Sequence, residues 1–292
     1  MKFSICIPVF DRPAMLANAL RTVARQTHQD LEVVVKDGCL ARPAPQDREV
    51  EAVFRLLAPR VRYVLSPDRG IFPALNEALR YASGDVLYFM CSDDELGDEH
   101  TIEAVDAVLR GIAGPAWAYG QTEWMDEGGV GQEVYGSRVE FATLLKKNTI
   151  SQSTVFWNRA MFRSVGYFNE RYTHSADYDY WLRSWKISPG VYLPRILGRV
   201  RRWSGSHSSS NGLNQLRDGH LISLEHRKTA IRNATLRFMA DEIEWRLRLL
   251  RHRAPQVWWA FLKITLPIRR SLGLRRERIA SVLNKFKLLA TR

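Results

Sequence analysis

The chain has 292 residues, with 43 Lys and Arg against 31 Asp and Glu, so its formal net charge is +12. Residues 1–245 hold 30 basic and 30 acidic side chains, whereas residues 246–292 hold 13 basic side chains and one acid, Glu277. The charge excess therefore belongs to the last segment alone. With 46% hydrophobic and 11% aromatic residues the body has an ordinary globular composition, which excludes a disordered chain, a collagen-like repeat and a nucleic-acid-binding body.

The cysteines and the N-terminus indicate where the protein resides. Cys6, Cys39 and Cys91 are an odd number without CxxC or metal-binding spacing, which indicates buried, reduced thiols and a reducing compartment. Pro8 and Asp11 interrupt the N-terminus before an apolar stretch of signal-peptide length, and no apolar run approaches the ~20 residues that a membrane-spanning helix needs. We therefore expect a cytoplasmic protein.

Apolar runs alternate with helical spacing in the first third of the chain. Runs rich in β-branched and aromatic residues predict strands at Phe3–Phe10, Leu31–Lys36, Val61–Leu65 and Val86–Met90. Helical spacing predicts helices between them, at Ala14–Arg25, Gln46–Leu57 and Pro73–Tyr81. This order is typical of a Rossmann-like α/β fold with a mostly parallel sheet and flanking helices, in which ligands bind at the carboxyl ends of the strands.

Every predicted strand is followed by at least one aspartate, and the set is Asp11, Asp37, Asp68, Asp93 and Asp94. Each alone could cap a helix or begin a turn. Together on one edge they would repel one another unless a cation or hydrogen-bond donors lie among them. The pattern therefore indicates a divalent metal ion with a phosphorylated ligand.

The pattern changes after Gly120. Polar, Gly-rich residues 121–135 predict a hairpin or mobile loop. Further elements are expected as helices at Val139–Lys147, at Ala160–Val165 and from Ser175, a strand at Ser153–Trp157, a strand pair within Val191–Arg202, and an amphipathic helical region from Leu213 to Arg251. We expect a catalytic domain of residues 1–210, with a donor-binding half (1–120) and an acceptor-side half (121–210), followed by a helical, basic region of residues 211–292.

Seven motifs in order over residues 3–210 resemble family-two glycosyltransferases of the GT-A fold. They are SICIPVF (4–10), VVKDG (34–38), SPDRGI (66–71), ASGD (82–85) leading to SDD (92–94), QSTVF (152–156), GYFNE (166–170) and DYDYWLR (177–183). The resemblance implies a hexosyltransferase-type, inverting enzyme. It would move a sugar from a UDP-, dTDP- or GDP-linked donor to an acceptor hydroxyl in one metal-assisted displacement.

The resemblance also implies where the donor nucleotide binds. Asp37 would face the base, because a carboxylate can accept the imide N–H of uracil or thymine. Other donor contacts are expected from Pro8, Phe10, Asp11, Asp68, Arg69 and Asp93, with Asp93 on the ribose. Arg69 could equally be a solvated loop side chain. The family's acidic, Ser/Thr-rich continuation after Gly38 is replaced here by residues 39–43 (CLARP), so contacts from that stretch are not carried over.

For the metal, Asp94 matches the final carboxylate of the family's DxD-type element and would coordinate Mn²⁺ or Mg²⁺ at the diphosphate. His207 could supply a further ligand, although a single surface His more often has no such role.

For the chemistry of the acceptor, Asp177 matches the general base, with Asp179 as the fallback and Gln152 as an acceptor or donor-sugar contact. A plain helix N-terminus is the alternative for Asp177. Asp179 can pair with Arg183 at i,i+4 spacing.

The basic segment 246–292 contains Trp258, Trp259 and Phe261 between arginine clusters. Aromatic residues beside many cations are typical of a segment that lies in an anionic membrane interface. This would suit a lipid-linked or cell-envelope saccharide acceptor in polysaccharide biosynthesis, with the enzyme peripheral at the inner face of the cytoplasmic membrane. Packing on the body or within a homo-oligomer is the alternative.

Three function classes compete. They are the inverting glycosyltransferase, a nucleotide-sugar-binding protein without transferase activity, and a nucleic-acid binder with a basic tail. The presence of Asp37, Asp94 and Asp177 favours the first over the second. The neutral body and the lack of a sequence-reading motif disfavour the third, so we expect no specific nucleic-acid partner.

Overall fold

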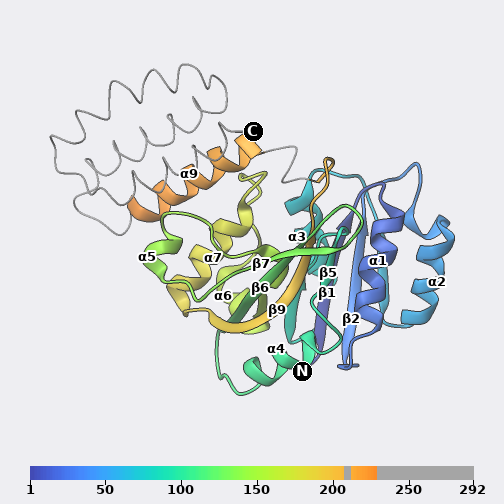
Figure 1. Ribbon diagram of the computed structural model, residues 1–292, viewed down its shortest axis with the longest axis horizontal. Coiled ribbons are helices and arrows are strands. Elements are labelled where there is room, and N and C mark those ends of the chain that lie inside the picture. Colours follow the sequence, from blue (N-terminus) through green and yellow to red (C-terminus); the bar gives the residue numbers. More distant parts are fainter. Residues whose placement is uncertain (207–211, 229–292) are drawn as a thin grey trace. The chain divides into compact units, whose positions relative to one another are not determined.

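The computed structural model describes residues 1–206 and 212–228 (Figure 1). All of these residues belong to the first of two compact units, Met1–Arg232 and Asn233–Arg292. His207 and the basic segment 246–292, for which we predicted a metal-ligating and a membrane-binding role, lie outside the described residues.

A nine-stranded mixed sheet forms the centre of the described unit, in the order β3-β2-β1-β4-β8-β6-β9-β5 with β7 paired to β6. The strands are β1 (Phe3–Val9), β2 (Leu31–Asp37), β3 (Val61–Leu65), β4 (Val86–Phe89), β5 (Asp94–Leu96), β6 (Trp117–Met125), β7 (Gly131–Tyr135), β8 (Phe156–Asn158) and β9 (Val191–Arg201). Strands β1 to β4 are mutually parallel, whereas β8 is antiparallel to β4 and β5 is antiparallel to β9. The predicted α/β fold class is confirmed.

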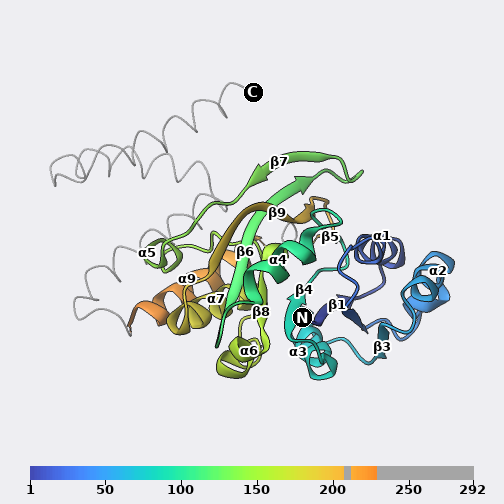
Figure 2. The same ribbon diagram turned by 90° about the horizontal axis from the view of Figure 1, so that it is seen from below.

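Helices cover both faces of this sheet (Figure 2). They are α1 (Pro13–Ala24), α2 (Arg48–Leu57), α3 (Ile71–Tyr81), α4 (Thr101–Leu109), α5 (Phe141–Leu144), α6 (Arg159–Val165), α7 (Ala176–Ile187) and α9 (Gly212–Lys228), with 3₁₀ turns η1 (Ala44–Gln46) and η2 (Gln152–Thr154). One hydrophobic cluster joins α1, α2 and α4 to the sheet, and a second joins α3, α6, α7 and α9 to its other face.

Strands β1 and β2 are buried on both faces, which explains their nearly continuous apolar sequences. Ile5 and Ile7 point into the first cluster, whereas Cys6 between them points into the second. Val33 and Val35 in β2 face the first cluster and Val34 faces the second. Successive side chains of a strand point to opposite faces, so a strand covered on both sides must be apolar throughout.

Several predictions of the acceptor-side elements were wrong. Val191–Arg201 forms one strand rather than two, and the ladder between β6 and β9 shifts register near Pro194, which has no N–H to donate. The helix expected at Val139–Lys147 is only the short α5, and the strand expected from Ser153 begins at Phe156, after η2. In the donor-binding half, strand β5 and helix α4 were not predicted.

Strand β9 and turn η2 approach each other closely at Gly198. A Cβ at this position would lie 2.1 Å from the carbonyl oxygen of Ser153. Only glycine allows that approach. It fixes η2, which carries Gln152, against the same strand that pairs with β5.

Glu32 fastens β2 to β1 and to the turn before β4. Its carboxylate accepts hydrogen bonds from Ser4 Oγ at 2.6 Å and from the backbone and side chain of Ser83 at 2.5 and 2.8 Å, and it pairs with Lys2 Nζ at 2.7 Å. Burial by itself raises the pKa of Glu32, but these partners outweigh burial and lower the pKa to about 2.

We predict that Glu32→Gln lowers the free energy of unfolding at pH 7 by roughly 1–3 kcal/mol, the range for hydrogen bonds to a charged group. Because the folded-state pKa is depressed, the stabilisation is complete above the ordinary carboxyl pKa and disappears as the pH falls toward about 2. Urea unfolding of both proteins at pH 7 and pH 3 should show a smaller difference at pH 3. An equal difference at the two pH values would contradict the prediction.

Candidate functional site

The loops after β1, β2 and β3 meet at the carboxyl edge of the sheet. A Cβ at Gly38, directly after β2, would lie 2.6 Å from Asp68 Cβ and 3.1 Å from the ring of Phe10. The backbone N–H of Gly38 donates to Val9 O at 2.9 Å, which ties this loop to the end of β1. Phe10, Gly38 and Asp68 therefore form one surface, although they come from three different loops.

Asp37, the last residue of β2, shapes the loop that follows it. Its Oδ1 accepts a hydrogen bond from Cys39 N at 2.8 Å, and its Oδ2 accepts from Ala44 N and Tyr63 OH, both at 2.7 Å. The residue is 1% exposed. Three internal donors therefore hold this buried carboxylate, and each of its oxygens already accepts at least one hydrogen bond.

The remaining predicted donor residues differ in their surroundings. Phe10 is 54% exposed, and Pro8 lies buried inside β1. Asp11 adopts a positive φ of 51° and pairs with Arg42, a residue of the replaced loop. Asp68 Oδ1 accepts from Gly70 N at 3.3 Å, and Arg69 beside it is exposed.

Lys36 of β2 supports the loop after β3, a role that we did not predict from the sequence. It is 1% exposed, and its Nζ donates to the carbonyl oxygens of Ser66 at 3.0 Å and Pro67 at 3.3 Å. A buried ammonium group needs such acceptors, so Lys36 holds the loop that carries Asp68.

Asp93 and Asp94 follow β4 and lead into β5. Asp94 is the first residue of β5 and lies opposite Val200 of β9. It is 5% exposed, and its pKa is raised well above the usual carboxyl value by burial and by the neighbouring charge of Asp93. Among the described residues Asp94 forms no ion pair, so this buried carboxylate has no compensating positive charge there.

The surroundings of Cys91 relate Asp177 to Asp93 and Asp94. Burial raises the pKa of its thiol well above the usual value, and the charges of Asp94, Asp93 and Asp177 raise it further. Coulombic effects of this kind act over several ångströms in a buried setting, so they indicate the same region of the molecule and not direct contact. The thiol also donates to Gln152 Oε1 at 3.6 Å. Asp93, Asp94 and Asp177 therefore lie in the region around Cys91, and Gln152 contacts its thiol.

Asp177 is the second residue of α7 and is partly exposed. Burial raises its pKa to about 6, and the opposing hydrogen bonds from the Tyr178 backbone and from Asn148 Nδ2, the latter at 3.3 Å, are weaker. Ser175 occupies the N-cap position, so Asp177 is not the cap of this helix. A partly exposed carboxylate with this pKa is ionised at neutral pH and can accept a proton from a bound molecule.

Asp179 has a different environment. It is 4% exposed, its Oδ2 accepts from Arg183 Nε at 2.7 Å, and its Oδ1 lies 2.8 Å from His226 Nε2 of α9. Burial raises its pKa, but the hydrogen bonds and charges of His226 and Arg183 prevail and lower it. The pairing with Arg183 is confirmed. Two residues along a helix correspond to a rotation of about 200°, so Asp179 points away from the face that carries Asp177.

The donor atoms at this edge fit a divalent cation. Asp94 offers the hard carboxylate oxygens that Mg²⁺ and Mn²⁺ prefer, and such ions take the rest of their ligands from water and phosphate. Within residues 1–206 and 212–228, no three His, Cys, Asp or Glu side chains converge into a complete protein metal site. A single carboxylate completed by water and a diphosphate is consistent with both observations.

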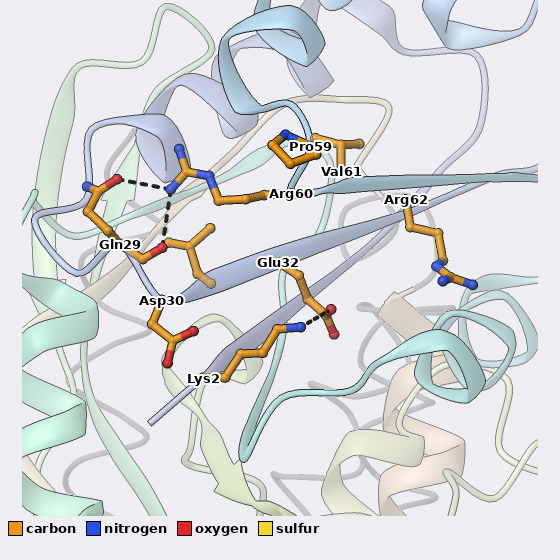
Figure 3. A pocket seen from close by; sticks show the side chains of 9 residues that line it. Lys2, Gln29, Asp30, Glu32, Pro59, Arg60, Val61 and Arg62 are labelled. Atoms are coloured by element: carbon orange, nitrogen blue, oxygen red, sulfur yellow. Dashed lines mark hydrogen bonds and ion pairs between the residues drawn. The ribbon is translucent and has the colours of Figure 1, made fainter.

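A separate pocket of about 510 Å³ opens at the opposite end of β2 and β3 (Figure 3). It is lined by residues that include Lys2, Glu32, Gln29 and Arg60. Lys2 pairs with Glu32 at 2.7 Å, and Arg60 Nη1 donates to Gln29 Oε1 at 3.0 Å. These polar side chains pair with one another, and the pocket contains none of Asp93, Asp94 and Asp177.

Comparison with known proteins agrees with this geometry. The family model described as Glycosyl transferase family 2 matches residues 4–166, more than half of the chain. A "PGL/p-HBAD biosynthesis glycosyltransferase" of Mycobacterium bovis is 29% identical over 185 residues, which are 62% of this chain and 68% of the relative. An uncharacterized glycosyltransferase of Rickettsia conorii is 25% identical over 219 residues, 71% of this chain and 35% of the relative.

Solved structures share the fold. TarS from S. aureus superposes with a TM-score of 0.61 at 16% identity, covering 87% of this chain and 74% of TarS. The mannosyltransferase PcManGT from Pyrobaculum calidifontis, solved with GDP-Man and Mn²⁺, superposes with a TM-score of 0.62 at 14% identity, covering 100% of this chain and 81% of that protein. The GT-A-like fold expected from the motifs is confirmed.

We predict that Mn²⁺ added with UDP or GDP raises the Tm of the wild-type protein but not that of Asp94→Asn. A ligand that binds only the folded state stabilises it, and the variant loses a charged metal ligand. Thermal unfolding with and without Mn²⁺ measures the difference. Glu49→Gln, which alters an exposed carboxylate of α2, should keep the full Mn²⁺ effect. An unchanged Mn²⁺ effect in Asp94→Asn would remove Asp94 from the metal site.

Proposed function

Because the chain belongs to glycosyl transferase family 2, we propose that it transfers a sugar from a nucleotide-diphospho-sugar to an acceptor hydroxyl with inversion at the anomeric carbon. The observation that carries the proposal is the placement of Asp93 and Asp94 at the carboxyl edge of the sheet, in the same region as the partly exposed Asp177, since the charges of all three act on the Cys91 thiol. One pair of carboxylates follows a strand of the nucleotide-binding half, and the third begins a helix of the other half. Diphosphate departure and acceptor activation would thus occur side by side.

Asp177 is the proposed general base. Inversion in a single displacement needs a group that accepts the proton of the acceptor hydroxyl as its oxygen attacks. A carboxylate with a pKa of about 6 is ionised at pH 7 and is a better proton acceptor than an ordinary carboxylate. Asp179 is less suited to this role, because both of its oxygens already bind Arg183 and His226.

Asp93 and Asp94 are proposed to bind the ribose and the metal ion, respectively. Mn²⁺ or Mg²⁺, when bound, would offset the charge that develops on the departing diphosphate. The buried carboxylate of Asp94, which has no ion-pair partner in the described part of the chain, supports this assignment. Phe10, Asp37 and Asp68 are proposed to line the base pocket. TarS was solved with UDP-GlcNAc and PcManGT with GDP-Man, so UDP- and GDP-linked sugars are both suitable first donors to test, with dTDP-linked sugars beside them.

The proposed acceptor is a lipid-linked or cell-envelope saccharide. This proposal is supported by the mycobacterial relative, whose name places it in PGL/p-HBAD biosynthesis, and by the basic, Trp-containing segment 246–292. Among the described residues no helix is both long and apolar enough to cross a bilayer. The proposed contact with a membrane is surface binding by the basic segment.

The first test is turnover of UDP-, GDP- and dTDP-linked sugars with Mn²⁺, followed by comparison with Asp177→Asn. We predict that this substitution lowers kcat by about 10²- to 10⁴-fold, the usual contribution of a general base, while the donor KM changes little. The wild-type kcat should fall as the pH drops through about 6, because the base becomes protonated there. Loss of this acidic limb in the residual activity of Asp177→Asn confirms the assignment.

Two outcomes separate the alternatives. Donor binding without hydrolysis or transfer, under all donors and acceptors, would favour a nucleotide-sugar-binding protein. Transfer with an unaltered acidic limb in Asp177→Asn would assign the base to another residue. The anomeric configuration of the product, read by NMR, decides between inversion and retention.

We predict that the full chain floats with liposomes of anionic lipid, whereas a chain that ends at residue 245 does not. Each interfacial cation contributes on the order of 1 kcal/mol at an anionic surface, and the removed segment carries 13 of them. Neutral liposomes provide the control for the electrostatic part. Equal flotation of the two chains would refute membrane binding by this segment.

A further inference from the structure

After β9 the chain turns back toward Asp93. The backbone N–H of Arg202 still donates to Met125 O at 2.9 Å, and that of Ser206 closes the turn by donating to Trp203 O at 3.1 Å. Gly205 lies so close to the Trp203 ring that a Cβ there would be 2.2 Å from it. The indole is thus held by its own turn, with its N–H directed at Asp93.

One oxygen of Asp93 is fixed by this turn and the other is not. Trp203 Nε1 donates to Asp93 Oδ2 at 2.9 Å, and Arg12 Nη1 lies 3.8 Å from the same oxygen. Asp93 Oδ1 has no hydrogen-bond partner in residues 1–206 and 212–228. Within the described part of the chain, the carboxylate therefore has one oriented oxygen without a partner, at the edge where the donor is proposed to bind.

Arg12 joins the parts of this arrangement. It occupies the position before α1, directly beyond the end of β1. Its guanidinium lies 4.6 Å from the centroid of the Trp203 ring, and its Nη2 donates to Gly205 O at 2.9 Å. Cation–π contact and a hydrogen bond thus hold the turn against β1. We call Arg12, Trp203 and Gly205, together with Asp93 Oδ2, the Arg12–Trp203 clamp.

Other contacts already hold the end of β9. Arg199 Nε binds Glu123 at 2.6 Å, and Arg201 Nη2 binds Glu95 at 2.8 Å. The strand is also paired along its length with β6 and, near its end, with β5. Since the sheet does not need the clamp to keep β9 in place, the principal effect of the clamp falls on Asp93.

We propose that Arg12 and Trp203 are positioning residues that orient Asp93 Oδ1 toward the ribose hydroxyls of the donor nucleotide. This inference rests on the proposed function. The terminal torsion of an aspartate is broad, so an unrestrained carboxylate loses freedom when it binds a ligand. The hydrogen bond from Trp203 fixes that torsion before the nucleotide arrives, and Arg12 fixes Trp203.

Two conservative substitutions test the clamp. Trp203→Phe removes the N–H donor to Asp93 but keeps a ring under Arg12, and Arg12→Lys keeps the charge but loses the planar guanidinium. Arg21→Lys is the matched control, because Arg21 lies on the adjoining helix α1 and binds only the exposed Asn18 and Glu49 side chains. Thermal unfolding should show that all three variants remain folded.

The measurement is calorimetric titration with UDP and with GDP in the presence of Mn²⁺, each compared with its 2′,3′-dideoxy analogue. We expect Trp203→Phe and Arg12→Lys to bind the ribonucleotide roughly tenfold more weakly, as for the loss of one hydrogen bond to a charged group. The analogue lacks the ribose hydroxyls, so its affinity should be the same for wild type, both clamp variants and Arg21→Lys. An equal loss for ribonucleotide and analogue would show a merely structural role and overturn the proposal.

A double-substitution cycle tests whether Trp203 acts through Asp93. In the Asp93→Ala background, Trp203→Phe should cause no further loss of ribonucleotide affinity, because the group that it orients is absent. Additive losses would overturn the inference. Wild-type protein that binds neither UDP nor GDP would overturn the proposed function as well, whereas nucleotide binding that is insensitive to Trp203→Phe overturns the clamp alone.

Discussion

The crowding of carboxylates at one edge of the sheet is the constraint on which the rest of the structure depends. The charges of Asp93, Asp94 and Asp177 all act on the Cys91 thiol, and burial raises the pKa of Asp94 and of Asp177. Charges in this arrangement are costly unless a cation or donors compensate them. The three carboxylates have different partners. Asp93 receives the indole N–H of Trp203 and lies 3.8 Å from Arg12, and Asp177 receives the amide of Asn148. Asp94 receives hydrogen bonds from Cys91 but has no ion-pair partner among the described residues. These differences support the different roles proposed for them.

Strand β9 connects the two halves of the described unit. Its last residues, 198–200, pair with β5, which begins at Asp94. Along its length β9 also pairs with β6 of the acceptor-side half. Gly198 allows η2 and its Gln152 to approach the strand, while Arg199 binds both Glu95 and Glu123. One extended segment thus sets the spacing between the residues proposed to bind the donor and those proposed to serve the acceptor.

The sequence was sufficient to predict whatever depends on local pattern. Strands β1, β2 and β4 could be predicted because burial on both faces requires continuous apolar runs, whereas β3 at the edge of the sheet was predicted from its β-branched and aromatic residues. The aspartates after these strands could be placed because parallel strands share a carboxyl edge. Strand β5 has only three residues, and its hydrogen-bond partner β9 begins about a hundred residues later in the chain. The local sequence pattern therefore does not predict it. The contact of Trp203 with Asp93 spans 110 positions. Of the three donors to Asp37, Cys39 N belongs to the loop that departs from the family pattern, Ala44 N follows that loop directly, and the Tyr63 hydroxyl comes from β3. Such tertiary contacts were beyond the reach of sequence patterns.

Helix α9 contributes to the surroundings of α7, the helix that carries Asp177. It covers the beginning of α7, where Ser175 Oγ donates to Gln215 O at 3.3 Å and His174 N donates to Asp218 at 2.9 Å, and its His226 shares the buried Asp179 with Arg183. Without α9, Ser175 at the N-cap of α7 would lose its contact with Gln215. The buried carboxylate of Asp179, two residues from Asp177, would lose His226 and keep Arg183. Helix α9 thus packs with the element that carries Asp177, and both belong to the compact unit Met1–Arg232.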